Sequence, residues 1–247
     1  MGGRGSATDR ASTKFGGGES AGRASAASGG GAIIDNYGKE EQAMARKIFG
    51  KNMTGQELAT MAGANAFSGA TVEFGVRDGK LEINIFHKKI TEATDDGGGM
   101  KRTFYKDRGG AKIRNDAFFL KESAQGQGLG AKSLASQVRA AQKAGVKEIN
   151  TFALTDGRGS VGHKVWADLG YNGKLSTRVQ TDWKNANPLE SLRGVKPPTT
   201  IHELYARGGR SFWARRGESQ NMVFKLNRGS KSVKILETYI KNKGYKI

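Results

Sequence analysis

The sequence predicts a mixed α/β fold, in which helices pack on a sheet that contains both antiparallel and parallel strands. Two alternating runs flank Asp78 and Gly79, a pattern typical of an antiparallel hairpin. A strand, a glycine-rich loop at residues 125–131, a helix and another strand then follow in order. Strands joined through one helix pair in parallel, so the sheet is expected to be mixed.

The chain begins with a segment that cannot form a core. Residues 1–31 are mainly Gly, Ser and Ala with scattered charges, and they bury too little apolar area to offset the entropy of ordering. We therefore expect a disordered leader at 1–31 and a main domain at 32–192. Residues 39–49 have helical composition, and Thr54 with Glu57 forms a capping box that opens a second, short helix.

The antiparallel part of the sheet follows. Residues 70–77 and 81–86 alternate with period two around a type I′ turn at Asp78 and Gly79. Apolar character predicts two further strands at 100–105 and 113–121. The strand at 113–121, the fourth in order, leads directly into the glycine-rich loop.

The parallel part and the C-terminal region are predicted in the same way. A helix at 132–144 ends at a glycine, and strand 146–154 and helix 162–169 come next. Beyond them we expect one or two helical turns at 201–207 and a terminal helix at 233–243.

Residues 193–247 are predicted to form a basic extension. They carry 13 Lys and Arg against 3 Asp and Glu, in a chain whose formal net charge is +18. Aromatic side chains alternate with arginines at Tyr205, Phe212 and Trp213. This composition favours nucleic acid or another polyanion as partner, and the alternative is an ordinary small β extension with a solvated basic face.

Several classes of site are excluded or disfavoured. The chain has no cysteine, which rules out disulfides and thiolate metal sites. His87, His163 and His202 lie far apart, so no metal site is expected. The sequence has neither an apolar run long enough to span a membrane nor the apolar core of a signal peptide.

The glycine-rich loop predicts a seat for phosphate. Gly126, Gly128 and Gly130 expose backbone N–H groups where a helix begins, next to the positive end of its dipole. Lys132 comes one position too late for a P-loop, and the strict alternation does not fit the dinucleotide fingerprint. The spacing of Gln125, Gly128 and Gly130 matches the pattern Q-x-x-G-x-G/A.

On this motif the sequence resembles the GNAT acetyltransferase superfamily, over roughly residues 35–173. The order of elements agrees with that family, and the stretch from Trp166 to Tyr171 is similar to its Tyr-x-x-x-Gly-Phe segment. The chain also resembles GNAT-like domains of bacteriophage and prophage proteins. The resemblance implies an acyl-CoA N-acyltransferase fold.

The resemblance also implies a cofactor and site residues. Acetyl-CoA would lie between the fourth and fifth strands, with its pantetheine arm along Leu120 and Lys121. Its pyrophosphate would bind the loop residues, namely Gln125, Gly126, Gln127, Gly128, Leu129, Gly130 and Ala131.

The expected catalytic residues are Glu122 and His163, each a candidate base for the acceptor amine. The family often uses a tyrosine to protonate the leaving thiolate, and this chain has Trp166 there, whose indole cannot do so.

Three functions follow from these expectations. The first is acetyl-CoA-dependent N-acetyl transfer to an amine of a small molecule or protein. The second is a phage virion-associated or host-interacting protein that keeps the fold without catalysis. The third is nucleic-acid binding through 193–247. The expected location is the cytoplasm of a bacterial host or the virion, with no membrane contact.

Overall fold

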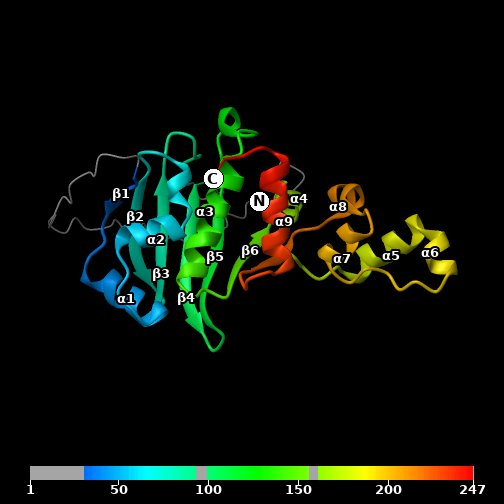
Figure 1. Ribbon diagram of the computed structural model, residues 1–247, viewed down its shortest axis with the longest axis horizontal. Coiled ribbons are helices and arrows are strands. Elements are labelled where there is room, and N and C mark those ends of the chain that lie inside the picture. Colours follow the sequence, from blue (N-terminus) through cyan, green and yellow to red (C-terminus); the bar gives the residue numbers. More distant parts are fainter. Residues whose placement is uncertain (1–30, 93–98, 156–160, 247) are drawn as a thin grey trace, which may run out of the picture.

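A computed structural model describes residues 31–92, 99–155 and 161–246. It contains one seven-stranded mixed sheet with helices packed on it, which confirms the mixed α/β class (Figure 1). The predicted leader lies outside the described residues except for Gly31.

The strands follow one another across the sheet in chain order, from β1 to β7. The pairs β1–β2 and β5–β6 are parallel, and the other neighbouring pairs are antiparallel. The strands are β1 (Ile33–Asp35), β2 (Thr71–Arg77), β3 (Lys80–Phe86), β4 (Met100–Asp107), β5 (Gly110–Phe118), β6 (Glu148–Ala153) and β7 (Gln220–Lys225).

The predicted hairpin of β2 and β3 is confirmed. Arg77 pairs with Lys80, so only Asp78 and Gly79 form the turn. Their φ angles of 50° and 69° are both positive, as a type I′ turn requires.

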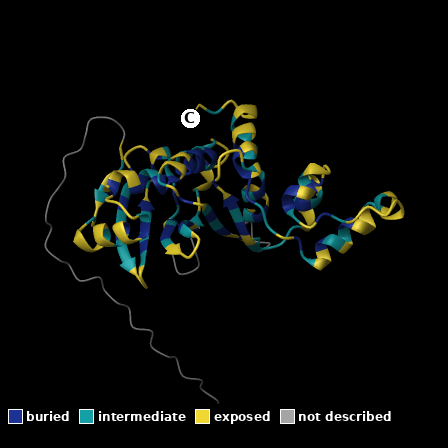
Figure 2. Ribbon diagram, turned by 60° about the horizontal axis from the view of Figure 1, so that its bottom comes forward, coloured by how far each residue is buried: buried dark blue, intermediate teal, exposed yellow. Residues whose placement is uncertain are grey.

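The structure contains helices that pack on one face of the sheet and helices that lie beside it. They are α1 (Lys39–Phe49), α2 (Gly55–Met61), α3 (Leu129–Lys143), α4 (Gly162–Asp168), α5 (Thr177–Ala186), α6 (Pro188–Leu192), α7 (Ile201–Ala206), α8 (Arg210–Arg216) and α9 (Lys231–Asn242). In Figure 1, α1, α2, α3 and α9 lie across the front of the sheet. Strand residues alternate accordingly: Leu81, Ile83 and Ile85 are buried, and the residues between them are partly exposed. Figure 2 colours the ribbon by burial.

The open face of the sheet is polar. Ion pairs join neighbouring strands there, such as Lys101 with Glu82 at 2.7 Å and Lys112 with Glu148 at 2.9 Å. These charged side chains are partly exposed, so this face of the sheet is in contact with solvent.

Residues 193–247 do not form one extension. Helices α5 to α8 make an arm beside the sheet (Figure 1), with a small core in which Trp183 and Phe212 meet edge to face at 5.2 Å. By contrast, β7 pairs with β6 along its length, and α9 packs on β7. The boundary expected after residue 192 therefore runs through the arm, and the chain returns to the sheet at Gln220.

The strand expected at 113–121 lies three residues earlier, as β5. Its start is fixed by a tight turn, because Asp107 pairs with Gly110 and accepts a 2.7 Å hydrogen bond from the Gly109 N–H. Sequence reasoning missed this second hairpin. No helix in the described ranges is both long and apolar enough to cross a bilayer.

Candidate functional site

Strands β5 and β6 begin as a parallel pair and then separate. Their register runs from Lys112 with Glu148 to Asn115 with Thr151, where the Thr151 hydroxyl donates to the Asn115 carbonyl at 3.0 Å. Both strands continue past this last pair. The sheet therefore opens between them on the side of their carboxyl ends.

The chain after β5 forms backbone hydrogen bonds with residues 89–91, on the edge that faces away from β6. The Thr91 N–H donates to the Phe119 carbonyl, and the Lys121 N–H donates to the Lys89 carbonyl, both at 3.0 Å. The backbone N–H and C=O of Leu120 therefore point to the opposite edge, toward β6. The Gln125 side-chain amide already donates to the Leu120 carbonyl at 3.1 Å.

The glycine-rich loop joins a short 3-10 helix, η2 (Glu122–Ala124), to α3. Gly126 and Gly128 have φ angles of 71° and 74°, which glycine adopts without strain. The first α3 hydrogen bond runs from the Lys132 N–H to the Gly128 carbonyl at 2.9 Å. The N–H groups of Leu129, Gly130 and Ala131 have no acceptor within the helix and form the positive end of its dipole. Anions often bind to backbone N–H groups in this arrangement.

The C-terminal tail covers part of this loop. A Cβ placed on Gly128 would lie 2.6 Å from Cζ of Tyr245, so the tyrosine ring rests on the glycine backbone. Tyr245 follows the end of α9, where its N–H donates to the Ile240 carbonyl at 3.2 Å.

Aromatic side chains pack near the point where β5 and β6 separate, which we call the wedge. The Phe118 ring lies 6.3 Å from the half-buried Trp166, which lies 5.0 Å from the buried Tyr171. Trp166 is thus a packing residue between the Phe118 and Tyr171 rings.

A buried polar network lies where the wedge begins. Asn115 and Gln137 exchange two side-chain hydrogen bonds of 2.9 and 3.0 Å, and the Asn115 amide also donates to the Tyr171 hydroxyl at 3.0 Å. Burial raises the pKa of Tyr171 well above its ordinary value.

Arg102 is next to Asn115 on the adjacent strand and is fully buried. Its guanidinium donates to the Ala117 carbonyl at 2.6 Å and lies 5.3 Å from the centre of the Phe118 ring, while its Nε has no partner. Burial lowers the pKa of Arg102 to about 10. Sequence reasoning missed this residue, although a charge between the inward-facing Met100 and Phe104 was a usable signal.

The two candidate bases lie in different surroundings. Glu122 is exposed at the start of η2. His163 is 7% exposed and packs on Trp213, whose indole N–H donates to the His163 carbonyl at 3.0 Å. Burial lowers the pKa of His163. No hydrogen bond among the described residues joins these two side chains.

The residues expected to hold the cofactor lie in two short segments on either side of η2. Leu120 and Lys121 lie just past the end of β5, and residues 125–131 form the loop and the first turn of α3. Lys121 also borders a cavity of about 600 Å³ with Phe86, His87 and Ile90. The described residues contain no group of three metal-ligating side chains.

Comparison with protein-family models, with curated proteins and with solved structures gave no match.

Proposed function

We propose that this protein is a GNAT-like N-acyltransferase, which binds acetyl-CoA and transfers its acetyl group to an amine. The observation that carries the proposal is the separation of β5 from β6 after Asn115 and Thr151, followed at once by the glycine-rich loop and α3. A gap between parallel strands offers unpaired backbone groups, and the helix start beside it offers an anion seat.

The backbone would hold the coenzyme, which supplies an activated acetyl thioester. The N–H groups of Leu129, Gly130 and Ala131 would donate to the pyrophosphate, and the N–H of Leu120 to the pantetheine arm. The Gln125 side chain would release the Leu120 carbonyl, and Tyr245 would have to move off Gly128.

Glu122 is the better placed of the two candidate bases. Its carboxylate is exposed beside the loop, where an amine can reach it, whereas the His163 ring is buried against α8 (Arg210–Arg216). In the proposed reaction Glu122 would take a proton from the amine, whose nitrogen would bond to the acetyl carbon. The C–S bond would break, and the thiolate would take up a proton. Because the Trp166 indole cannot supply that proton, it would come from water or from another group.

Calorimetric titration with acetyl-CoA tests whether the coenzyme binds. Two variants at one position test whether its pyrophosphate lies at the glycine-rich loop. Gly126 has open space around it and a φ that Asn and Asp both tolerate. Gly126→Asp and Gly126→Asn therefore impose the same backbone strain and differ in charge. We expect the Asp variant to bind about tenfold more weakly than the Asn variant, through repulsion of the pyrophosphate. Equal affinities would contradict a pyrophosphate at the loop.

Release of coenzyme A tests the transfer step. The chain contains no cysteine, so a thiol-reactive chromogenic reagent detects released coenzyme without background from the protein. With a mixture of polyamines and a lysine-rich peptide as acceptors, we expect Glu122→Gln to lower the rate by about 100-fold or more. Glu237→Gln, at an exposed site on α9, is the control and should keep the full rate.

A second function is favoured by Trp166, which packs between Phe118 and Tyr171. It is a virion-associated or host-interacting protein that keeps the fold without turnover. Acetyl-CoA binding with no coenzyme release from any acceptor would support this second function over the first.

A further inference from the structure

A positively charged groove runs along the outer side of α3. The cavity measures about 550 Å³ and lies between α3 and the chain around α2. Its lining includes four cations, Lys132, Arg139, Lys143 and Lys246, and no carboxylate. We call this the α3 groove.

The sequence of α3 places three of these cations in a row. They stand at spacings of seven and four residues, which keep side chains on one face of a helix and separate the ends of the row by about 16 Å. The opposite face of α3 buries Leu134 and Val138 against the core. Lys246 joins the row from the C-terminal tail, directly after Tyr245.

The charges of the row are not neutralised. In the part of the chain that the structure describes, none of the four cations has a carboxylate within 4 Å. The carboxylate that acts on Lys143 from nearby is Glu57, which accepts hydrogen bonds from Thr54 at the start of α2. The lining of the groove therefore carries positive charge with no carboxylate among its residues.

Helix stability does not account for this row. A lysine in the last turn interacts favourably with the helix dipole, which suits Lys143, but Lys132 lies in the first turn, where a cation is unfavourable. Arg139 and Lys143 are also four residues apart, so their like charges repel. The row costs folding free energy, and a bound polyanion would offset that cost.

We propose that the α3 groove binds the phosphate backbone of nucleic acid. A row of about 16 Å spans the rise of about five nucleotides along a duplex axis, at 3.4 Å per nucleotide, so several phosphates lie within reach of its cations. The remaining lining consists of Ala, Ser, Thr and Asn side chains, which offer hydrogen bonds but no apolar pocket for the side chains of a peptide partner.

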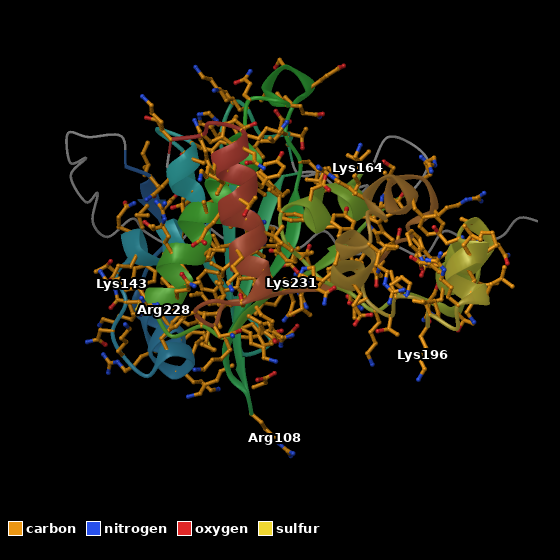
Figure 3. All side chains as sticks on the ribbon, turned by 45° about the vertical axis from the view of Figure 1, so that its right-hand side comes forward. Arg108, Lys143, Lys164, Lys196, Arg228 and Lys231 are labelled. Atoms are coloured by element: carbon orange, nitrogen blue, oxygen red, sulfur yellow. The ribbon has the colours of Figure 1, made fainter. Side chains whose placement is uncertain are left out.

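The row extends past the end of α3. The Gln142 side chain donates to the Leu226 carbonyl at 2.9 Å, which brings the nearby Arg228 to the same end of the helix. Figure 3 labels Lys143 and Arg228 at this end, while Arg108 and Lys196 lie elsewhere on the molecule.

This inference does not depend on the proposed acyl transfer. Arg139 and Lys143 are about 15 and 21 Å along α3 from Leu129, so changing them leaves the glycine-rich loop intact. Both side chains are exposed, and their replacement does not disturb the core.

Fluorescence anisotropy with a labelled 20-nucleotide single strand and the matching duplex tests the groove, on the full chain at several salt concentrations. The test variant is Arg139→Gln with Lys143→Gln. The control is Arg108→Gln with Lys196→Gln, which removes two exposed cations outside the groove, one of them from residues 193–247.

We expect the slope of log K against log[salt] to fall by about 1.4 to 1.8 in the groove variant, because two phosphate contacts are lost. The control should keep the slope of the original chain, and acetyl-CoA titration should be the same for all three proteins. Equal losses in both variants, a larger loss in the control, or equally tight binding of polyglutamate would each overturn the proposal.

Discussion

The ring of Tyr245 rests on the backbone of Gly128, so closely that a Cβ placed on the glycine would lie 2.6 Å from the ring. Gly128 is the N-cap of α3 and has a φ of 74°. The last residues of the chain are therefore packed on the loop that we propose holds a pyrophosphate. Stability and ligand binding at the loop should both depend on this contact.

Gly128→Ala should destabilise the protein for two reasons, a strained positive φ and a collision with Tyr245. Gly50→Ala measures the backbone strain alone, because Gly50 has a φ of 73° and nothing within 4 Å of its Cβ position. We expect a loss of about 1 kcal/mol for Gly50→Ala and of about 2 to 4 kcal/mol for Gly128→Ala in urea unfolding. Adding Tyr245→Ala to Gly128→Ala should recover part of the difference, and no recovery would contradict the contact.

Tyr245→Ala alone should strengthen binding of acetyl-CoA, because the ring no longer has to leave the loop. We expect a decrease in Kd of about threefold to tenfold by calorimetry. The size of the decrease reflects the fraction of molecules in which Tyr245 covers the loop. Tyr245→Phe keeps the ring and is the control, with an unchanged Kd. Weaker binding by the Ala variant would mean that the ring supports the ligand instead of covering its seat.

Local signals predicted part of this fold well. The expected helix at 39–49 coincides with α1, and Asp78 and Gly79 placed the β2–β3 hairpin correctly. Both depend on residues close in sequence, where composition and turn chemistry act directly. The turn at Arg108 and Gly109 is weaker as a signal, and missing it shifted the predicted fourth strand by three residues.

Long-range pairing set the limit of prediction. Strand β7 has a mixed polar sequence and becomes a strand through its partner β6, about 70 residues earlier. For the same reason the sequence could indicate the glycine-rich loop but not the Tyr245 ring that covers it. The buried Arg102 and Asn115 were also missed, since their meeting depends on the register of β4 with β5.

Gln137→Leu should destabilise the protein because it leaves the buried Asn115 side chain without its reciprocal partner. We expect a loss of about 1 to 3 kcal/mol in urea unfolding, the cost of an unsatisfied buried polar group. Gln142→Leu, an exposed position on the same helix that bonds the Leu226 carbonyl, is the matched control and should lose less than about 1.5 kcal/mol. Equal losses would show that the buried network adds no more stability than the hydrogen bond at the exposed Gln142.

Stability should fall between pH 7.5 and pH 5.5. Burial lowers the pKa of His163 and of His202 in the folded chain. As the pH falls through about 6.5, the unfolded chain takes up protons that the folded chain does not, so the free energy of unfolding decreases. Carboxylates titrate mainly below this window. His163→Gln should show a smaller decrease by urea unfolding at the two pH values, and an unchanged decrease would contradict the assignment of the effect to His163.

Hydrogen–deuterium exchange on the full chain, with and without saturating acetyl-CoA, tests whether the coenzyme binds at the glycine-rich loop. It reports on the backbone N–H groups that we propose as donors. We predict slower exchange in peptides that cover residues 116–121 and 125–132, and no change in the arm at residues 201–216. Unchanged exchange at the glycine-rich loop, or protection confined to another part of the molecule, would contradict acetyl-CoA binding at this loop.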